Sequence, residues 1–298
     1  MRPVHILLTV LLTLIWGCNF VVVSTGLSDI PPLLFCTIRF LLASIPAVFL
    51  LKKPDIAWHY ICLYGLFMFA LQFGLMFEGM HFGAPPGLSS LIAQTQVFFT
   101  LILGGVFFNE KPTKIQLGGA LVAFSGIGLV AIKSGSHIPM SGLFFVLAGA
   151  IAWGIGNLIT KKIGKVNGLS LVAWGCLVAL VPMFLTSLAT EGLDQIINSI
   201  QNISTTGILA TLYIVYLSTW VGYGIWGFLL NQYPIATVVP FTLLVPVFGM
   251  LSAIVFFDEP MQSWKIGAAM LILLGLMINL FGPRLRVRMA GPQVLMDL

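Results

Sequence analysis

The chain has 298 residues, of which 59% are hydrophobic and only 8% are charged, and its formal net charge is +5. Soluble domains carry about 25% charged residues, so this composition excludes a water-soluble globular protein. It predicts an all-α integral membrane protein, because a helix satisfies its own backbone groups inside lipid.

Apolar runs separated by short polar segments fill most of the chain. Each run approaches the ~20 residues that a helix needs to cross a bilayer. In chain order, the ten predicted transmembrane helices cover residues 4–26, 33–51, 59–80, 87–108, 114–132, 141–160, 169–189, 206–230, 235–257 and 263–282.

One pattern of residues occurs twice. Residues 107–112 read Phe-Phe-Asn-Glu-Lys-Pro, and residues 256–260 read Phe-Phe-Asp-Glu-Pro. In each copy, glycines follow the glutamate by eight and by sixteen residues: Glu110, Gly118 and Gly126, then Glu259, Gly267 and Gly275. We therefore predict a tandem duplication, with a first repeat at 1–134, a second at 135–284 and a basic tail at 285–298.

Each repeat holds five predicted spans, so the two copies would enter the membrane from opposite sides as an inverted repeat. If the N-terminus is cytoplasmic, most Lys and Arg residues lie in cytoplasmic segments, and only Lys133 and Lys265 lie in external ones. This asymmetry predicts that both termini and the basic tail are cytoplasmic. It also accounts for the positive net charge without a nucleic-acid partner.

Ionisable residues inside a bilayer are costly and are therefore functional hypotheses. Arg39 lies deep in the second span and could bind the carboxylate of a zwitterion, or it could bond backbone carbonyls and fix the bundle. Glu78 is a candidate for proton coupling, although it could instead be solvated at the end of its span. Glu110 and Glu259 precede spans five and ten at equivalent positions, which indicates structural roles near helix N-termini.

Neutral polar and aromatic side chains within spans are the other candidates for lining a substrate site. Gln94 and Phe98 lie four residues apart, and Tyr216 and Tyr223 lie seven apart, so each pair would share one helix face. Buried amides also join helices to one another, and aromatic faces also pack as core. The full set of candidates is Trp16, Asn19, Gln72, Gln94, Phe98, Trp153, Asn157, Tyr216 and Tyr223.

Patterns typical of enzymes are weak. The cysteines and histidines have no metal-ligand spacing, and the chain contains neither HExxH nor GxSxG. Residues 222–227 match the letters of the dinucleotide fingerprint but lie inside a continuous apolar segment, which favours close helix packing instead. We predict no catalytic residue, no metal site and no cofactor.

Several stretches resemble a known family. They are WGCNFVVVSTGL from Trp16, PPLLFCTIRF ending at Phe40, FGAPPGLSSLIAQTQVFFTLILG from Phe82, VGYGIWGFLLNQY from Val221 and TLLVPVFGMLSAIVFFDE from Thr242. With the five-plus-five pattern, they resemble the drug/metabolite transporter superfamily, and within it the EamA family of bacterial inner-membrane exporters. The resemblance implies a central cavity that opens alternately to each side, and it extends to exporters of cysteine and O-acetylserine.

We therefore expect a monomeric, multi-pass transporter of the bacterial inner membrane. Its partners would be the lipid bilayer and a small amino-acid-like substrate, with cysteine and O-acetylserine as first candidates. One alternative is the same fold exporting aromatic amino acids, nucleosides or drugs. The other is an integral-membrane enzyme, which should show a cluster of reactive residues at one depth.

Overall fold

The computed structural model describes residues 1–109, 112–134 and 139–289. Within these ranges, ten helices are long and apolar enough to cross a bilayer. In order, they are Pro3–Gly26, Pro32–Leu50, Trp58–His81, Pro86–Phe108, Lys114–Lys133, Met140–Ile163, Gly168–Thr190, Thr205–Gln232, Val239–Phe257 and Ser263–Gly282. The predicted all-α membrane architecture with ten spans is confirmed.

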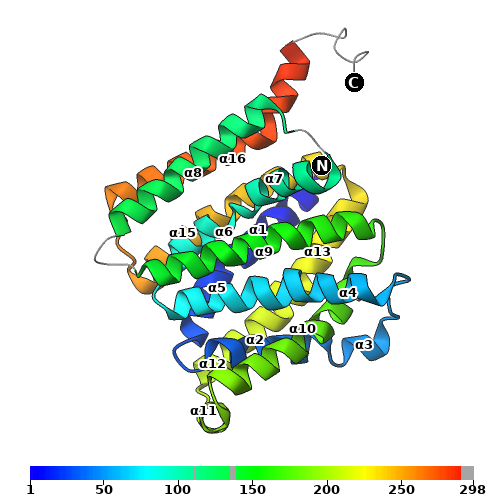
Figure 1. Cartoon of the computed structure of the whole chain (residues 1–298), viewed down its shortest axis with the longest axis vertical. Coiled ribbons are helices and arrows are strands. Elements are labelled where there is room, and N and C mark those ends of the chain that lie inside the picture. The colour runs from blue at the N-terminus through cyan, green and yellow to red at the C-terminus, as the bar shows by residue number, and fades with distance from the viewer. Residues whose placement is uncertain (110–111, 135–138, 290–298) are drawn as a thin grey trace.

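Several spans are built from more than one element, as Figure 1 shows. The elements are α1 (Pro3–Gly26), α2 (Pro32–Ser44), α3 (Ala47–Leu50), α4 (Trp58–Tyr64), η1 (Gly65–Leu71), α5 (Gln72–His81), α6 (Pro86–Ala93), α7 (Gln96–Phe108), α8 (Lys114–Ser134), α9 (Met140–Ile163), α10 (Gly168–Thr190), α11 (Leu193–Gln201), α12 (Thr205–Leu212), η2 (Tyr213–Val221), α13 (Gly222–Gln232), α14 (Ile235–Val238), η3 (Val239–Leu243), α15 (Leu244–Phe257) and α16 (Ser263–Met289).

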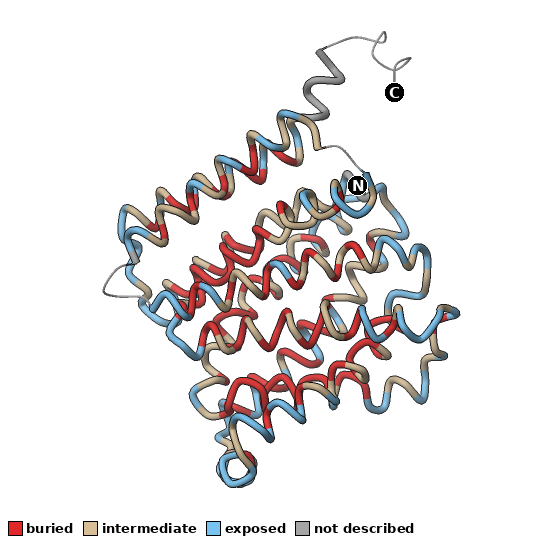
Figure 2. Tube along the Cα trace, viewed as in Figure 1, coloured by how far each residue is buried: buried red, intermediate tan, exposed pale blue. Residues whose placement is uncertain are grey.

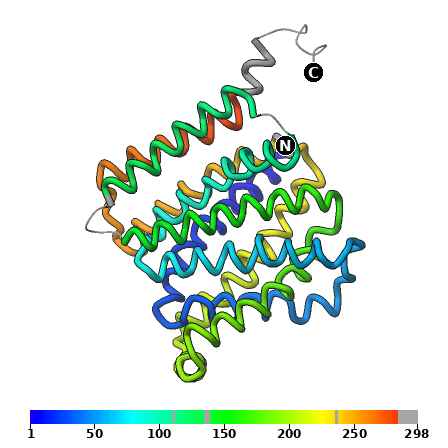
Figure 3. Tube along the Cα trace, viewed as in Figure 1, coloured from blue at the N-terminus to red at the C-terminus, as the bar shows by residue number. Residues whose placement is uncertain are grey.

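The spans pack in pairs that repeat with two-fold regularity. The fifth and tenth spans, α8 and α16, lie together at one edge of the bundle, and the second and seventh, α2 and α10, lie together near the other (Figures 1 and 3). Between these edges, α5 of the third span packs on α9, the sixth span, and the equivalent eighth span, α12 and α13, packs on α1, the first. Likewise α1 packs on α15 of the ninth span, and α9 packs on α7 of the fourth. Each contact therefore has a counterpart with the repeats exchanged, as an inverted repeat requires.

Helix irregularities also occur twice. The third span contains the π-helix η1 and the eighth contains the π-helix η2. The fourth span is interrupted between α6 and α7, and the ninth contains the 3-10 helix η3 before α15. Segments of π-helix are rare and frequently lie at functional sites. The third and eighth spans, which contain them, are therefore where a functional site would be expected.

Buried and exposed residues divide the bundle into a core and a surface. Buried residues concentrate on the middle helices, whereas exposed ones follow the ends and outer faces (Figure 2). Many exposed side chains are large and apolar, including Phe49, Leu121, Ile132 and Val255. An apolar surface of this kind suits contact with lipid.

Glycines allow α8 and α16 to approach closely. A Cβ atom at Gly119 would lie 2.8 Å from the carbonyl oxygen of Gly275, and one at Gly275 would lie 2.5 Å from that of Gly119. In contrast, a Cβ atom at Gly118 would meet no atom within 4 Å. Two of the repeated glycines are closely packed: Gly126 and Gly275, which follow the glutamates by sixteen residues. Gly118, which follows Glu110 by eight residues, faces open space.

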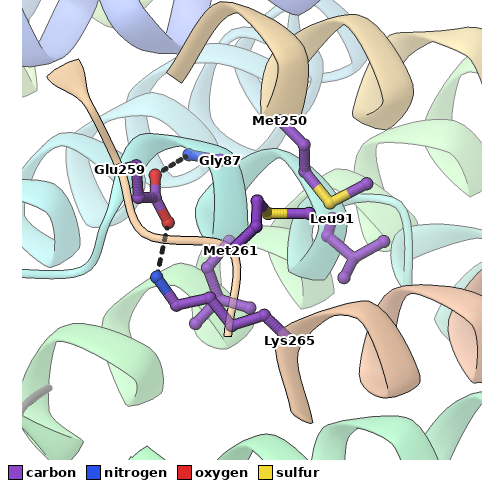
Figure 4. A pocket seen from close by; sticks show the side chains of 7 residues that line it. Gly87, Leu91, Met250, Glu259, Met261 and Lys265 are labelled. Carbon is purple, nitrogen blue, oxygen red and sulfur yellow. Dashed lines mark hydrogen bonds and ion pairs between the residues drawn. The ribbon is translucent and has the colours of Figure 1, made fainter. Parts of the chain in front are cut away.

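We call the end of the bundle that holds the N-terminus the N-side, and the opposite end the far side (Figure 1). On the far side, Glu259 accepts a hydrogen bond from the backbone N–H of Gly87 at 3.2 Å. It also forms an ion pair with Lys265 at 3.0 Å. Figure 4 shows this carboxylate between the start of α6 and the Lys265 ammonium. Glu259 thus joins the tenth span to the N-terminus of the fourth. Its counterpart Glu110 lies outside the described residues.

A second glutamate on the far side has a similar role. Glu191 accepts hydrogen bonds from the backbone N–H groups of Leu33 at 2.7 Å and Leu34 at 2.9 Å, and from the Ser187 hydroxyl at 2.5 Å. It therefore caps α2 from the end of α10. Sequence reasoning missed this residue, because no local pattern distinguishes it from a solvated acid after a span.

Replacing Glu191 with alanine should lower the thermal stability of the purified protein. Two α2 backbone N–H groups would lose a charged acceptor, which costs on the order of 2 kcal/mol in total. Melting in detergent, followed by fluorescence-detected gel filtration, measures the change. Asp194→Ala is the matched control, since Asp194 is exposed on α11, and its melting temperature should stay near that of the wild type. Equal losses in both variants would contradict the capping role.

Candidate functional site

A buried arginine lies where the two repeats meet. Arg39 on α2 is 2% exposed, and its Nε and Nη2 atoms donate to the hydroxyl oxygen of Thr219, at 3.3 and 3.1 Å. Its guanidinium carbon lies 3.9 Å from the ring centroid of Phe73 on α5, a cation–π contact. No carboxylate of a described residue lies within ion-pair distance of Arg39.

The hydroxyl that receives Arg39 is oriented by the π-helix η2. Thr219 donates its own hydroxyl hydrogen to the carbonyl oxygen of Ile214, five residues earlier, at 2.8 Å. With its hydrogen engaged there, the Thr219 oxygen is left to act as an acceptor for the guanidinium. The irregular turn of the second repeat therefore fixes the position of a charge supplied by the first repeat.

A chain of aromatic rings extends from Arg39 through both repeats. Phe73 stacks on Phe69 at 6.4 Å, Phe69 contacts Tyr223 at 6.1 Å, and Tyr223 contacts Trp16 at 5.7 Å. These rings come from α5, η1, α13 and α1. The indole N–H of Trp16 donates to a backbone carbonyl of η2, that of Ser218, at 3.1 Å. The site is thus built from the first, second, third and eighth spans.

Three buried polar atoms on the first three spans have no hydrogen-bond partner among the described residues. They are Nη1 of Arg39, Oδ1 of Asn19 and Oε1 of Gln72. Asn19 is 8% exposed and Gln72 is 3% exposed. An unpaired buried polar group costs about 1–3 kcal/mol, so a partner of the opposite hydrogen-bonding character would stabilise each of these atoms. Nη1 of Arg39 is a charged donor on the second span, and the oxygens of Asn19 and Gln72 are neutral acceptors on the first and third spans.

The structure separates the predicted candidates into groups. Trp16, Arg39 and Tyr223 are linked through ring and cation contacts, whereas Tyr216 is 50% exposed among outward-facing apolar side chains of the eighth span. Trp153 is partly buried against the main core. Glu78 is partly buried near the end of its span, and no hydrogen bond of its side chain to a described residue is formed.

The fourth-span candidates lie elsewhere. Gln94 is buried at the interruption between α6 and α7, and Phe98 is fully buried against Phe124 of α8, 6.0 Å away. Asn157 on α9 donates to the side-chain oxygens of Gln96, at 2.6 Å, and Thr100, at 3.1 Å. The structure therefore does not bring Phe98 and Asn157 into contact with Arg39.

Sequence reasoning missed Thr219, Phe73 and Phe69 as neighbours of Arg39. Threonine and phenylalanine are common in apolar spans, so neither residue type stood out. The one available signal was that a buried arginine without an acid requires neutral acceptors or an aromatic face, but the sequence does not say which span provides them.

Comparisons with known proteins agree with a duplicated membrane architecture. The model of the EamA-like transporter family matches residues 4–132 and again residues 140–281. A protein of Salmonella typhimurium named "Probable amino-acid metabolite efflux pump" is 42% identical over 286 residues, covering 94% of this chain and 95% of that protein. An Escherichia coli K12 protein with the same name is 40% identical, with the same coverage.

A solved structure described as "Crystal structure of protein" has a TM-score of 0.66 to this fold. The likeness covers 96% of this chain and 100% of the other, at 17% sequence identity. At this level of identity the match supports the fold alone.

Proposed function

The chain belongs to the EamA-like transporter family, and from that premise we propose that it exports small amino acids and related metabolites, with cysteine and O-acetylserine as first candidates. The names of the Salmonella and Escherichia relatives, both "Probable amino-acid metabolite efflux pump", support an amino-acid-like cargo. In this proposal the protein is a monomer of the bacterial inner membrane with both termini in the cytoplasm.

The observation that carries the proposal is the buried Arg39, which has no carboxylate partner among the residues that the structure describes. A buried cation is costly when unpaired, and the carboxylate of a zwitterionic substrate would supply the missing charge. The free Nη1 atom is the donor available to it. Bidentate hydrogen bonds between guanidinium and carboxylate add geometric selectivity to the charge attraction.

In this proposal the unpaired oxygens of Asn19 and Gln72 bind the ammonium group of the substrate. An ammonium group carries three donors and no acceptor, so neutral carbonyl oxygens suit it better than further cations. Phe73, Phe69 and Tyr223 would bound the space for the side chain. Large substrates such as aromatic amino acids, nucleosides and drugs are then disfavoured, because these rings already contact one another.

The duplicated irregularities support alternating access as the mechanism. We assign the two halves to residues 1–134 and 135–284, with the substrate between them. The η1 and η2 segments, and the interruptions of the fourth and ninth spans, are the places where each half can bend, since regular helix resists bending. Glu191 and Glu259 hold far-side contacts between the repeats and would have to release for that side to open.

Efflux from preloaded proteoliposomes that contain this protein alone tests the proposal. We expect cysteine and O-acetylserine to leave faster than from protein-free vesicles, and phenylalanine and uridine to leave at the background rate. Movement of the large solutes alone would contradict a small-substrate site. Chemical conversion without movement would instead identify an enzyme.

Glu78→Gln tests whether export is coupled to protons. We expect efflux of O-acetylserine to remain within about twofold of wild type, with and without an imposed pH gradient, because no hydrogen bond or ion pair between described residues joins the Glu78 side chain to Arg39. Loss of a pH-gradient stimulation in this variant, with its folding unchanged, would instead assign proton coupling to Glu78.

A further inference from the structure

A short helix on the far side lies across the spans rather than along them. It is α11, which joins the end of α10 in the seventh span to the start of α12 in the eighth. Figures 1 and 3 show α11 end-on, near the edge of the bundle where α2 and α10 lie, whereas the spans run across the same view. Its axis is therefore close to the plane of the membrane. The equivalent connection of the first repeat, residues 51–57, forms no helix, so the duplication does not explain α11.

The residues of α11 divide into an apolar face and a polar face. Leu193, Ile196, Ile197 and Ile200 follow the i, i+3, i+4, i+7 spacing that places side chains on one face of a helix. Ile196 is 5% exposed and belongs to the main core, whereas the other three are between 42% and 57% exposed. We call these three the apolar stripe. All remaining positions of α11 are polar: Asp194, Gln195, Asn198, Ser199 and Gln201.

The buried part of α11 is too small to explain why this segment is helical. The helix has nine residues, of which Ile196 alone is buried, and its N-cap Gly192 forms no side-chain cap hydrogen bond. Isolated helices of this length are marginal in water. At the boundary between lipid headgroups and acyl chains, in contrast, an amphipathic helix removes its apolar face from water and keeps its polar face hydrated.

The apolar stripe continues the surface that the neighbouring spans present to lipid. Only two residues separate α11 from α10, and three separate it from α12. Both of these helices carry large apolar side chains that are exposed: Phe184, Leu185, Leu188, Ile208, Leu209 and Leu212. The stripe therefore lies at the far-side margin of a surface that already faces acyl chains.

Contacts at both ends of α11 fix its position on the first repeat. Before the helix, the Glu191 carboxylate accepts from the backbone N–H groups of Leu33 and Leu34. After it, the Ser204 hydroxyl donates to the carboxylate of Asp29. Both ends thus hold the connection between α1 and α2 and the start of α2. While these contacts are formed, α11 cannot move away from the end of the bundle.

We propose that α11 is an interfacial helix, whose apolar stripe inserts into the far-side leaflet at the boundary between headgroups and acyl chains. Its partner is the lipid, bound through apolar area rather than through charge. The helix carries Asp194 and neither lysine nor arginine, so anionic headgroups offer it no attraction. The inserted helix holds Glu191 and Ser204 at the depth where they meet the first repeat. The proposal rests on the membrane-spanning architecture and not on the identity of the substrate.

Nitroxide labels on the full-length protein in phosphatidylcholine liposomes test the proposal. Cys18 and Cys62, the cysteines that are not buried, are first replaced by alanine. One label at a time is then placed on the stripe or on the polar face, by Ile197→Cys, Ile200→Cys, Gln195→Cys or Asn198→Cys. Power saturation of the nitroxide spectrum compares collisions with oxygen, which concentrates in lipid, and with a water-soluble nickel chelate. We expect the oxygen-to-nickel collision ratio to be severalfold higher on the stripe than on the polar face.

Two further measurements separate insertion by apolar area from attraction by charge. Replacing part of the phosphatidylcholine with phosphatidylglycerol should leave the ratios unchanged. Ile197→Asp places a charge on the stripe and should lower the ratio at Ile200→Cys toward that of the polar face. Asn198→Asp places the same charge on the polar face and should leave that ratio unchanged.

Three outcomes would contradict the proposal. Equal ratios on both faces, with the nickel chelate reaching the stripe, would place α11 in water. Few collisions with either reagent at the stripe would show that a second copy of the chain covers it instead of lipid. A stripe ratio that rises only when phosphatidylglycerol is present would show that headgroup charge, and not apolar area, holds the helix.

Discussion

Arg39→Ala is expected to reduce O-acetylserine efflux about 30-fold or more while leaving the protein folded. Removing one partner of a buried charge pair costs about 2–5 kcal/mol of binding, which sets the lower bound on the loss. Folding should survive, because Arg39 has no carboxylate partner among the described residues and removing an unpaired buried charge relieves a desolvation cost. Efflux rates and melting temperatures of the same preparations measure the two effects separately.

Two further variants decide between a substrate role and a structural role for Arg39. Arg39→Met restores apolar volume without charge and should be as inactive as Arg39→Ala. Thr219→Val removes the acceptor that positions the guanidinium but keeps the charge, so it should retain partial activity with a raised KM. If Arg39→Met transports normally, Arg39 does not bind substrate. If Arg39→Ala no longer folds, Arg39 has a structural role, and the activity of Arg39→Met then decides whether it also binds substrate.

Gly119→Ala is expected to destabilise the protein by about 1–3 kcal/mol, the usual cost of overpacking a tight contact. The new Cβ atom would lie 2.8 Å from the carbonyl oxygen of Gly275 and 3.1 Å from the backbone nitrogen of Asn279. Neither atom belongs to a flexible side chain, so α8 and α16 would have to separate. A lower melting temperature and reduced recovery of monodisperse protein would measure this.

The neighbouring glycine provides a matched control. Gly118→Ala adds the same methyl group one residue earlier, where it meets nothing within 4 Å. Alanine is also the better helix former, by up to about 1 kcal/mol, so this variant should be as stable as wild type or slightly more so. Equal destabilisation in both variants would contradict the close packing of α8 on α16.

Helix periodicity does not hold throughout the eighth span, for a physical reason. Tyr216 and Tyr223 share a face if the eighth span is a regular α-helix, but η2 runs from Tyr213 to Val221 as a π-helix with a wider turn. The register shifts, so Tyr223 contacts Phe69 while Tyr216 is 50% exposed. Between Gln94 and Phe98, the break between α6 and α7 interrupts the regular helix on which their predicted shared face depends.

Arg39 was predictable because its charge is exceptional inside a span, whatever the fold around it. Its neighbours were not predictable, since Thr219 lies 180 residues away and no charge or rare residue type marks it. Glu259 illustrates the same limit. Its repeated position indicated a structural acid near the tenth span, but its second partner, the Gly87 N–H, belongs to the fourth.

The sequence by itself determined that the chain crosses a membrane in ten helices, because partition into lipid depends on the length and apolarity of each segment taken alone. It also revealed the duplication, since repeated residues are visible without a structure. Only the tertiary structure decided which helix faces meet. Lateral association in lipid gains little from apolar surface as such and depends on close fit and hydrogen bonds. Gly118 and Gly119 are the same residue type in adjacent positions, and only the packing of α8 on α16 makes a Cβ atom clash at Gly119 and meet open space at Gly118.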